Sequence, residues 1–346
     1  MRLKTFYMIL SINIPTYNRV DYLVKNLCII IKQIYELEVV NDVEINITDN
    51  ASTDLTENSI LQIIKENPKL NVHYTKNKEN YGGEVNLIKA MNMAHGQYSI
   101  LLGDDDFFQK DALRKILLLL AQFPNNSVFL YNRTDINTKG YIIEEKKFLK
   151  GSFETQTFDF SNVCDGKKYF TLINTLGGAL SFTSSVIYKT SILKEIGDFD
   201  QQFYGSYYPF HFYWWGYLLK GHKLVYINDS FLNCTIGSYN DDLGTDRINR
   251  KVVDFYGFNK IAKLLFLNTP YYQDYIRCPF VDSDPLILSK LYCAYPKKFE
   301  KELLPYLLEA GWTNEYWLKF KRTYSLFGII KLFVKSCISN IFRYEG

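Results

Sequence analysis

Short apolar runs alternate with longer amphipathic stretches along the first third of the chain. Runs rich in β-branched and aromatic residues predict strands, whereas apolar residues that recur every three or four positions predict helices. The expected strands cover 6–14, 43–48, 71–75 and 98–102, and the expected helices cover 21–37, 56–66, 84–94 and 111–122. This alternation predicts an α/β fold with a mainly parallel, Rossmann-like sheet flanked by helices.

Polar residues gather at the points where these strands end. They follow the expected strands at 16–19, 49–54, 80–83 and 103–106. The carboxyl ends of parallel strands lie at one edge of a sheet, and ligands of such sheets bind beyond that edge. We therefore expect these clusters to meet in one binding site.

The pattern changes after about residue 125. Short strands, turn glycines and aromatic residues dominate up to about 235, which indicates a second half of the same sheet. Beyond that point the pattern is helical, with expected helices at 247–267, 285–293 and 299–310. We predict one domain over 1–235 and a helical C-terminal region over 236–346.

Composition and charge exclude several classes of protein. The net charge of +3 over 346 residues gives no field strong enough for a nucleic-acid partner, so none is expected. The 6 cysteines lie far apart and lack the spacing of a zinc or redox pair. They indicate reduced, mostly buried thiols in a cytoplasmic protein. No apolar run reaches the roughly 18 residues of a membrane-spanning helix.

Three consecutive aspartates, Asp104, Asp105 and Asp106, follow an apolar strand and Gly103. Partly buried carboxylates repel each other, so this arrangement is costly unless a cation or a donor-rich ligand compensates it. Mg²⁺ or Mn²⁺, held by a few carboxylates and by phosphate oxygens, fits such a site. The alternative is an acidic turn that caps the next helix, which explains Asp111 better than three acids in a row.

The other clusters offer groups that suit a nucleotide. Asp49 at a strand end can accept a hydrogen bond from a base-ring N–H, Tyr17 can stack on a base, and Arg19 can bind phosphate. Each cluster also has a simpler interpretation. Residues 53–54 can cap the following helix, and residues 15–18 suit a turn followed by a cap.

Together, these motifs stand in the order and spacing of family 2 glycosyltransferases. They read Ile-Pro-Thr-Tyr-Asn-Arg at 14–19, Asp-Asn-Ala-Ser-Thr-Asp at 49–54, Asn-Tyr-Gly-Gly at 80–83 with Asn86, and Gly-Asp-Asp-Asp at 103–106. The chain resembles this family over about its first 120 residues. It is most similar to the bacterial abequosyltransferase-like and rhamnosyltransferase-like enzymes that assemble O-antigen or capsule.

The resemblance implies a GT-A fold, with a nucleotide-sugar-binding half at 1–125 and an acceptor-binding half at 126–235. It also implies an inverting, metal-dependent transfer from a nucleoside diphosphate sugar to a glycan acceptor in surface polysaccharide synthesis, with Mg²⁺ or Mn²⁺ on the diphosphate. The residues that it places at the donor are Pro15, Thr16, Tyr17, Arg19, Asp49, Asn80, Gly83, Asn86 and Asp104, with Asp105 and Asp106 on the metal. One departure is Gly103, where many relatives carry an acid.

An inverting transfer also needs a base for the acceptor hydroxyl. The family usually supplies an acid just before an aromatic helix, but the corresponding stretch, 207–223, holds no carboxylate. His211 is the titratable group there that suits the role. A histidine buried among aromatic side chains explains it equally well. Asp198 and Asp200 are substitute bases, although both suit a turn.

The tail at 316–343 is aromatic, apolar and basic, without an acid between Glu315 and Glu345. This composition is typical of a helix on an anionic membrane surface, where a lipid-linked acceptor would be met. A C-terminal helix packed on the protein explains the pattern as well. We expect a cytoplasmic protein, peripheral on the inner face of the cell membrane if the first interpretation holds.

Two other classes of function stay open. A sugar nucleotidyltransferase needs a similar sheet and a metal, but no Gly-rich phosphate loop follows the first strand. A non-catalytic glycan-binding or scaffold protein on the same fold is compatible with the missing acid near His211. A dehydrogenase is disfavoured, because no Gly-x-Gly-x-x-Gly motif follows a strand.

Overall fold

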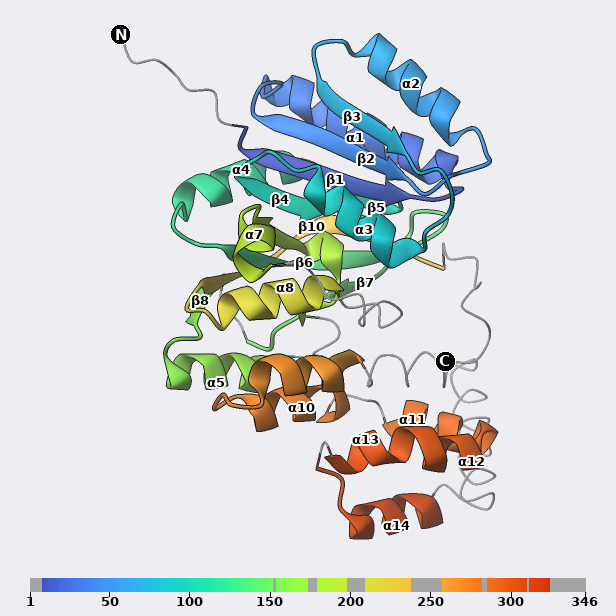
Figure 1. Cartoon of the computed structure of the whole chain (residues 1–346), viewed down its shortest axis with the longest axis vertical. Coiled ribbons are helices and arrows are strands. Elements are labelled where there is room, and N and C mark those ends of the chain that lie inside the picture. Colours follow the sequence, from blue (N-terminus) through green and yellow to red (C-terminus); the bar gives the residue numbers. More distant parts are fainter. Residues whose placement is uncertain are drawn as a thin grey trace, which may run out of the picture. The chain divides into compact units, whose positions relative to one another are not determined.

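The computed structural model describes residues 8–151, 154–173, 179–197, 209–237, 257–281, 285–309 and 311–323. The chain divides into two compact units, residues 1–240 and 241–346 (Figure 1). Each unit is considered by itself below.

The first unit is built on a large sheet. Its strands are β1 (Leu10–Thr16), β2 (Val43–Asp49), β3 (Asn71–Lys76), β4 (Tyr98–Leu101), β5 (Asp106–Phe108), β6 (Val128–Asn137), β7 (Ile142–Lys146), β8 (Thr155–Asp159), β9 (Val186–Lys189) and β10 (Lys223–Ile236). Its helices are α1 (Val20–Leu37), α2 (Thr56–Glu66), α3 (Gly83–Asn92), α4 (Ala112–Gln122), α5 (Val163–Leu172), the 3-10 helix η1 (Thr183–Ser185), α7 (Ile192–Ile196) and α8 (Pro209–Leu218).

The strand order is β3-β2-β1-β4-β9-β6-β10-β5, with β7 paired to β6 and β8 paired to β10. Strands β1 to β4 are parallel, as are β6 and β10. The antiparallel strand β9 joins these two groups. The predicted α/β class, with parallel central strands flanked by helices, is confirmed, and antiparallel strands extend the sheet.

The alternating sequences of β1 and β2 place different chemistry on the two faces of the sheet. On one face, Leu10, Ile12 and Ile14 join the buried apolar core together with side chains of α1, α2 and α4. On the other face, the Ser11 hydroxyl donates to Glu44 at 2.5 Å and the Asn46 amide donates to Asn13 at 2.9 Å. These polar side chains are also buried, because β1 and β2 are covered on both faces.

Two boundaries differ from the expectation in ways that affect the site. Strand β1 continues to Thr16, so Pro15 and Thr16 lie inside the strand and not in the turn after it. Asp106 begins the short strand β5, which pairs antiparallel with β10, where Cys234 lies opposite Asp106. Strand β5 was not predicted because three residues are too few to show a periodicity, and because its partner strand lies more than 120 residues further along the chain.

The described part of the second unit is helical, as predicted. Its elements are η3 (Ala262–Phe266), α10 (Tyr272–Val281), α11 (Pro285–Ala294), α12 (Pro296–Lys298), η4 (Phe299–Leu303), α13 (Leu304–Glu309) and α14 (Asn314–Thr323), of which η3 and η4 are π-helical. Residues 247–256 of one expected helix lie outside the described residues.

Helix α14 contains the start of the tail for which membrane contact is predicted. Its Trp317 and Phe320 are buried in an apolar cluster with Phe299, Leu303 and other side chains of this unit. These two aromatic residues are therefore packed within the protein and are not presented to a lipid surface. Residues 324–343 lie outside the described residues, so membrane contact stays a prediction for that part of the tail.

Within the described ranges, no helix is both long enough and apolar enough to cross a membrane. Cys28, Cys164, Cys234 and Cys293 are free thiols, but Cys28 and Cys164 are exposed, so the expectation of mostly buried thiols is wrong for these two. Both lie on amphipathic helices, and the sequence does not show which face of such a helix a single small residue occupies.

Candidate active site

The structure brings the predicted polar clusters together at the carboxyl ends of β1, β2 and β4. Backbone hydrogen bonds join them directly: the Asn50 N–H donates to the Thr16 carbonyl at 2.9 Å, and the Asn77 N–H donates to the Asp49 carbonyl at 2.8 Å. The Leu102 N–H donates to the Asn13 carbonyl at 2.9 Å, which brings the acidic loop to the same edge. The edge therefore holds one connected site.

The three aspartates of the acidic loop are buried, with 4 to 5% of their surface exposed. Asp104 accepts hydrogen bonds on both carboxylate oxygens, from the Thr16 hydroxyl at 2.8 Å and from Arg19 at 2.8 Å. The same guanidinium nitrogen lies 3.2 Å from an oxygen of Asp105. Arg19 therefore neutralises part of the charge that the carboxylates bring into the protein.

Distant side chains fix the backbone of this loop. The Asn26 amide of α1 donates to the Gly103 carbonyl at 3.0 Å, and the Thr235 hydroxyl of β10 donates to the Asp105 carbonyl at 2.8 Å. The Ser184 hydroxyl of η1 accepts from the Gly103 N–H at 2.9 Å and donates to Asp106 at 2.5 Å. The carboxylates are thus held in place by both halves of the first unit.

The structure gives a steric reason for Gly103, which stands where many relatives in the family carry an acid. A Cβ atom built on it would lie 2.7 Å from one oxygen of Asp106 and 3.2 Å from one oxygen of Asp105. The two carboxylates therefore converge on the space that a side chain at this position would fill. An acid at 103 would compete with them for that space.

Burial and mutual repulsion make the cluster electrostatically unfavourable. Burial raises the pKa of Asp104 to about 6, although the neighbouring Arg19 opposes the shift. Burial, together with repulsion from Asp105, also raises the pKa of Asp106. A raised pKa means that the ionised form is disfavoured, so further positive charge would stabilise the cluster.

The residues present fit a divalent cation. Oxygens of Asp105 and Asp106 converge above Gly103, and hard oxygen donors of this kind suit Mg²⁺ or Mn²⁺. No group of three or more His, Cys, Asp or Glu side chains within the described residues could hold a metal ion by itself. Sites for Mg²⁺ commonly use one or two carboxylates and complete the coordination with substrate phosphates.

Asp49 is completely buried at the end of β2. One of its oxygens accepts from the Tyr74 hydroxyl at 2.6 Å and the other from the Ser52 N–H at 2.7 Å. The carboxylate thus orders the loop after β2, and contact with a nucleotide base stays a prediction. The exposed aromatic rings at this edge are Tyr17 and Tyr81, with 42% and 39% of their surface accessible.

The predicted residues after β3 connect the loops. Asn80 accepts hydrogen bonds from the Asn50 amide at 2.6 Å and from the Gly82 N–H at 2.9 Å. Asn86 is buried in α3, whose first residue is Gly83, and donates to the Thr48 carbonyl at 2.9 Å. These contacts give Asn80 and Asn86 a role in positioning the loops.

Two non-glycine residues in the loops of the site adopt left-handed backbone conformations. They are Asn18, with a φ of 52°, and Ala51, with a φ of 64°. Asn18 tolerates this conformation better than most residues, and its side-chain oxygen accepts from the Thr53 N–H at 2.8 Å. Ala51 has no such compensation. The loop after β2 therefore stores strain next to the site.

His211, the predicted base, is completely buried in α8 between aromatic residues. Its Nε2 accepts a hydrogen bond from the Trp215 indole at 2.9 Å, and burial lowers its pKa to about 3. These surroundings favour the alternative of a core histidine, because an acceptor hydroxyl has no access to the ring. The substitutes Asp198 and Asp200 lie outside the described residues.

Several residues of the site escaped prediction from the sequence. Asn26 could have been found, because it is a polar residue on the buried face of α1. Arg133 and Asp135 of β6 form a partly buried ion pair at 2.7 Å, and the Arg133 guanidinium lies 4.0 Å from the centre of the Phe182 ring. Nothing in the sequence marked Ser184 as a site residue, because serine is common in irregular segments.

The sheet, with the acidic cluster at its carboxyl edge, has the arrangement of the GT-A fold. Residues 11–177 match the family described as Glycosyl transferase family 2. The chain is similar to this family over these residues, which are slightly less than half of its 346, and this similarity supports a glycosyltransferase.

Two named relatives illustrate the range of the similarity. The abequosyltransferase RfbV of Salmonella typhimurium is 29% identical over 259 residues, which are 74% of this chain and 74% of the relative. The putative teichuronic acid biosynthesis glycosyltransferase TuaG of Bacillus subtilis is 32% identical over 114 residues, 33% of this chain and 42% of the relative.

Solved structures share the fold. TarS of S. aureus, residues 1–349 in complex with UDP-GlcNAc, aligns over 88% of this chain and 79% of its own with a TM-score of 0.58 and 18% identity. The mannosyltransferase PcManGT of Pyrobaculum calidifontis, in complex with GDP-Man and Mn²⁺, aligns over 99% of this chain and 89% of its own. The TM-score is 0.57 and the sequence identity is 16%. At these identities the likeness concerns the fold alone.

Replacing Ala51 by glycine should raise the free energy of unfolding by up to about 1 kcal/mol, because the left-handed backbone costs an alanine roughly 1–2 kcal/mol. The matched control is Ala121→Gly on the exposed face of α4, which should lower it by about 1 kcal/mol. Urea unfolding measures both changes. Equal destabilisation by the two substitutions would contradict the strain at Ala51.

Replacing His211 by phenylalanine should lower the free energy of unfolding by about 1–3 kcal/mol, because the Trp215 indole loses a buried acceptor. His211→Gln, which can still accept, should lose less. Sugar transfer per folded molecule should change little in His211→Gln, whereas loss of a general base lowers rates roughly 10²–10⁴-fold. A rate loss of that size in a folded His211→Gln variant would restore the base assignment.

Proposed function

We propose that the chain is an inverting, metal-dependent glycosyltransferase that moves one sugar from a nucleoside diphosphate donor to a glycan acceptor. One observation carries the proposal. The buried carboxylates of Asp104, Asp105 and Asp106 converge at the carboxyl edge of the sheet with Arg19 as a counter-charge within reach. Such a site needs added positive charge and adjoins exposed rings, which suits a metal-bound nucleoside diphosphate.

The position of each residue in the site determines the role that we propose for it. Asp105 and Asp106 would hold Mg²⁺ or Mn²⁺, since both oxygens of Asp104 already accept from Thr16 and Arg19. The metal, when bound, supplies the positive charge that stabilises the leaving diphosphate. Arg19 orients Asp104 and lies where it can also contact a phosphate. Tyr17 offers an exposed ring on which a base can stack.

The second half of the first unit is proposed to bind the acceptor. In this proposal the base that removes the proton from the acceptor hydroxyl is not assigned to His211, because that side chain is completely buried. Asp198 or Asp200 takes this role in the proposal, because an acid before α8 is what the family resemblance implies. In an inverting transfer this base acts on the face of the sugar opposite the leaving diphosphate.

The relatives' names support a role in surface polysaccharide synthesis, since they include an abequosyltransferase and a teichuronic acid biosynthesis enzyme. We place the acceptor on a lipid carrier at the inner face of the membrane. The basic and aromatic residues at 324–343 are the proposed contact with that surface.

Asp105→Asn should lower the rate of transfer about a hundredfold or more, because removing one charge-stabilising group from an active site has effects of that size. The matched control is Asp111→Asn at the start of α4, where φ is 61° and asparagine fits the left-handed backbone. Release of free nucleoside diphosphate from a panel of donors with cell-derived acceptor measures the rate.

Release of pyrophosphate in that assay would instead identify a nucleotidyltransferase, and no product with any donor would favour a binding protein. Normal turnover of Asp105→Asn, with Asp111→Asn unchanged, would overturn the metal assignment. Thermal unfolding of both variants shows whether the fold is intact.

A further inference from the structure

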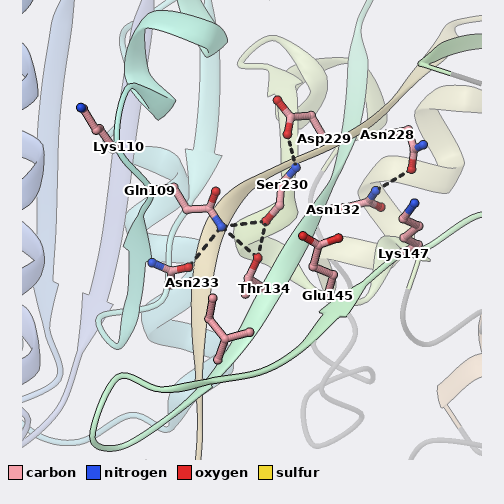
Figure 2. Close-up of a pocket in the computed structure, with 11 residues that line it drawn as sticks. Gln109, Lys110, Asn132, Thr134, Glu145, Lys147, Asn228, Asp229, Ser230 and Asn233 are labelled. Atoms are coloured by element: carbon pink, nitrogen blue, oxygen red, sulfur yellow. Dashed lines mark hydrogen bonds between the residues drawn. The ribbon is translucent and has the colours of Figure 1, made fainter.

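A cavity of about 400 Å³ lies between β5, β6, β7 and β10, outside the acidic site (Figure 2). Its volume falls within the range of roughly 300–1,000 Å³ that ligand pockets show. Unlike most such pockets, it is lined chiefly by amide, hydroxyl and charged side chains, with Ile142 as an apolar exception. This lining is suited to a hydrophilic ligand.

The cavity and the acidic site lie on opposite faces of the sheet. Successive side chains of a strand point to opposite faces, so Asn132 and Thr134 of β6 face one way while Arg133 and Asp135 face the other. Asn132 and Thr134 line the cavity. Asp135 lies opposite Cys234 of β10, which in turn lies opposite Asp106. A ligand in the cavity would therefore leave the acidic cluster free.

The floor of the cavity is a network of hydrogen-bond donors and acceptors. The amide nitrogen of Gln109 lies 2.9 Å from the Thr134 hydroxyl oxygen, 3.1 Å from the Ser230 hydroxyl oxygen and 3.1 Å from the Asn233 oxygen (Figure 2). It also lies 3.2 Å from the Leu232 carbonyl oxygen. The Thr134 and Ser230 hydroxyl oxygens also lie 3.1 Å from each other, and the Ser230 hydroxyl donates to the Leu232 carbonyl at 3.1 Å. Ligand hydroxyls, which both donate and accept, suit a lining of amide and hydroxyl groups.

An irregularity in β10 builds one wall of the cavity. The register of β10 against β6 shifts on both sides of Ser230, which is the signature of a bulge. The bulge presents Asn228 to Asn132, whose amide donates to the Asn228 oxygen at 3.0 Å. Asn132 is itself buried and accepts from the Tyr226 hydroxyl at 2.8 Å. Bulges of this kind are common next to functional sites, where they redirect side chains.

The charged groups around the cavity balance. Lys110 and Lys147 contribute two positive charges, and Glu145 and Asp229 contribute two negative charges. Asp229 also pairs with Lys115 at 2.7 Å. A phosphate or another compact anion would need an excess of positive charge, which this lining does not offer.

We propose that this cavity binds a neutral sugar unit of a glycan, as a second site distinct from the place of sugar transfer. The proposal goes beyond the transfer reaction and does not depend on it. Bound there, a glycan chain would be held by a sugar other than the one that reacts, which increases its effective concentration at the enzyme.

The test compares tryptophan at two neighbouring positions of β7. Glu145 lines the cavity, whereas Glu144 lies next to it in sequence on the opposite face and pairs with Lys146. Both are exposed, so Glu145→Trp and Glu144→Trp make the same change on the same strand. The indole at 145 can fill the cavity, and the indole at 144 cannot.

Saturation-transfer NMR on the full chain detects binding of the methyl glycosides of glucose, galactose, mannose and rhamnose, with and without uridine diphosphate. We expect a signal from at least one glycoside that uridine diphosphate does not abolish. It should be lost in Glu145→Trp, persist in Glu144→Trp, and weaken severalfold in Ser230→Ala, which removes one floor hydroxyl.

Absence of a signal from all the glycosides, or an unchanged signal in a folded Glu145→Trp variant, would overturn the proposal. A signal that uridine diphosphate abolishes would place the glycoside in the donor site and would overturn it as well. Thermal unfolding of each variant establishes that the fold is intact.

Discussion

The arrangement of the site depends on three carboxylates that lie close together after the end of β4. The carboxylates of Asp104, Asp105 and Asp106 are buried in the fold, and burial, together with repulsion from Asp105, raises the pKa values of Asp104 and Asp106. Each contact around them offsets part of that cost. Arg19 supplies charge, and Ser184 supplies a hydrogen bond. A residual deficit of positive charge is what a cation bound with a diphosphate would remove.

The same cluster connects the two halves of the first unit. Its backbone is held by Asn26 of α1 and Thr235 of β10, and its side chains by Thr16 of β1 and Ser184 of η1. The donor side and the proposed acceptor side therefore meet through hydrogen bonds within a few residues. The glycan cavity lies across the sheet from this point, on strands that also support the acidic loop. One group of strands would thus present two surfaces to carbohydrate.

Local periodicity predicted the strands and helices of the first third, because their apolar faces are long and regular. It also predicted that the polar clusters meet, since parallel strands end at one edge. It could not predict β5 or the contact with Ser184, which depend on residues far away in sequence. His211 is predicted as a base because the stretch at 207–223 lacks the acid of the family, but its burial depends on packing that the sequence does not show. Gly103 looked like a departure from the family until the convergence of its neighbours' oxygens gave it a steric reason.

Mn²⁺ binding followed by electron paramagnetic resonance tests the central claim most directly, with and without uridine and guanosine diphosphates. Two buried carboxylates without a full set of protein ligands should hold Mn²⁺ weakly alone and firmly once a diphosphate completes the coordination. The account therefore predicts that free Mn²⁺ signal disappears only when a nucleoside diphosphate is present. Mn²⁺ that stays free with every nucleotide, or that binds equally well without one, would contradict it.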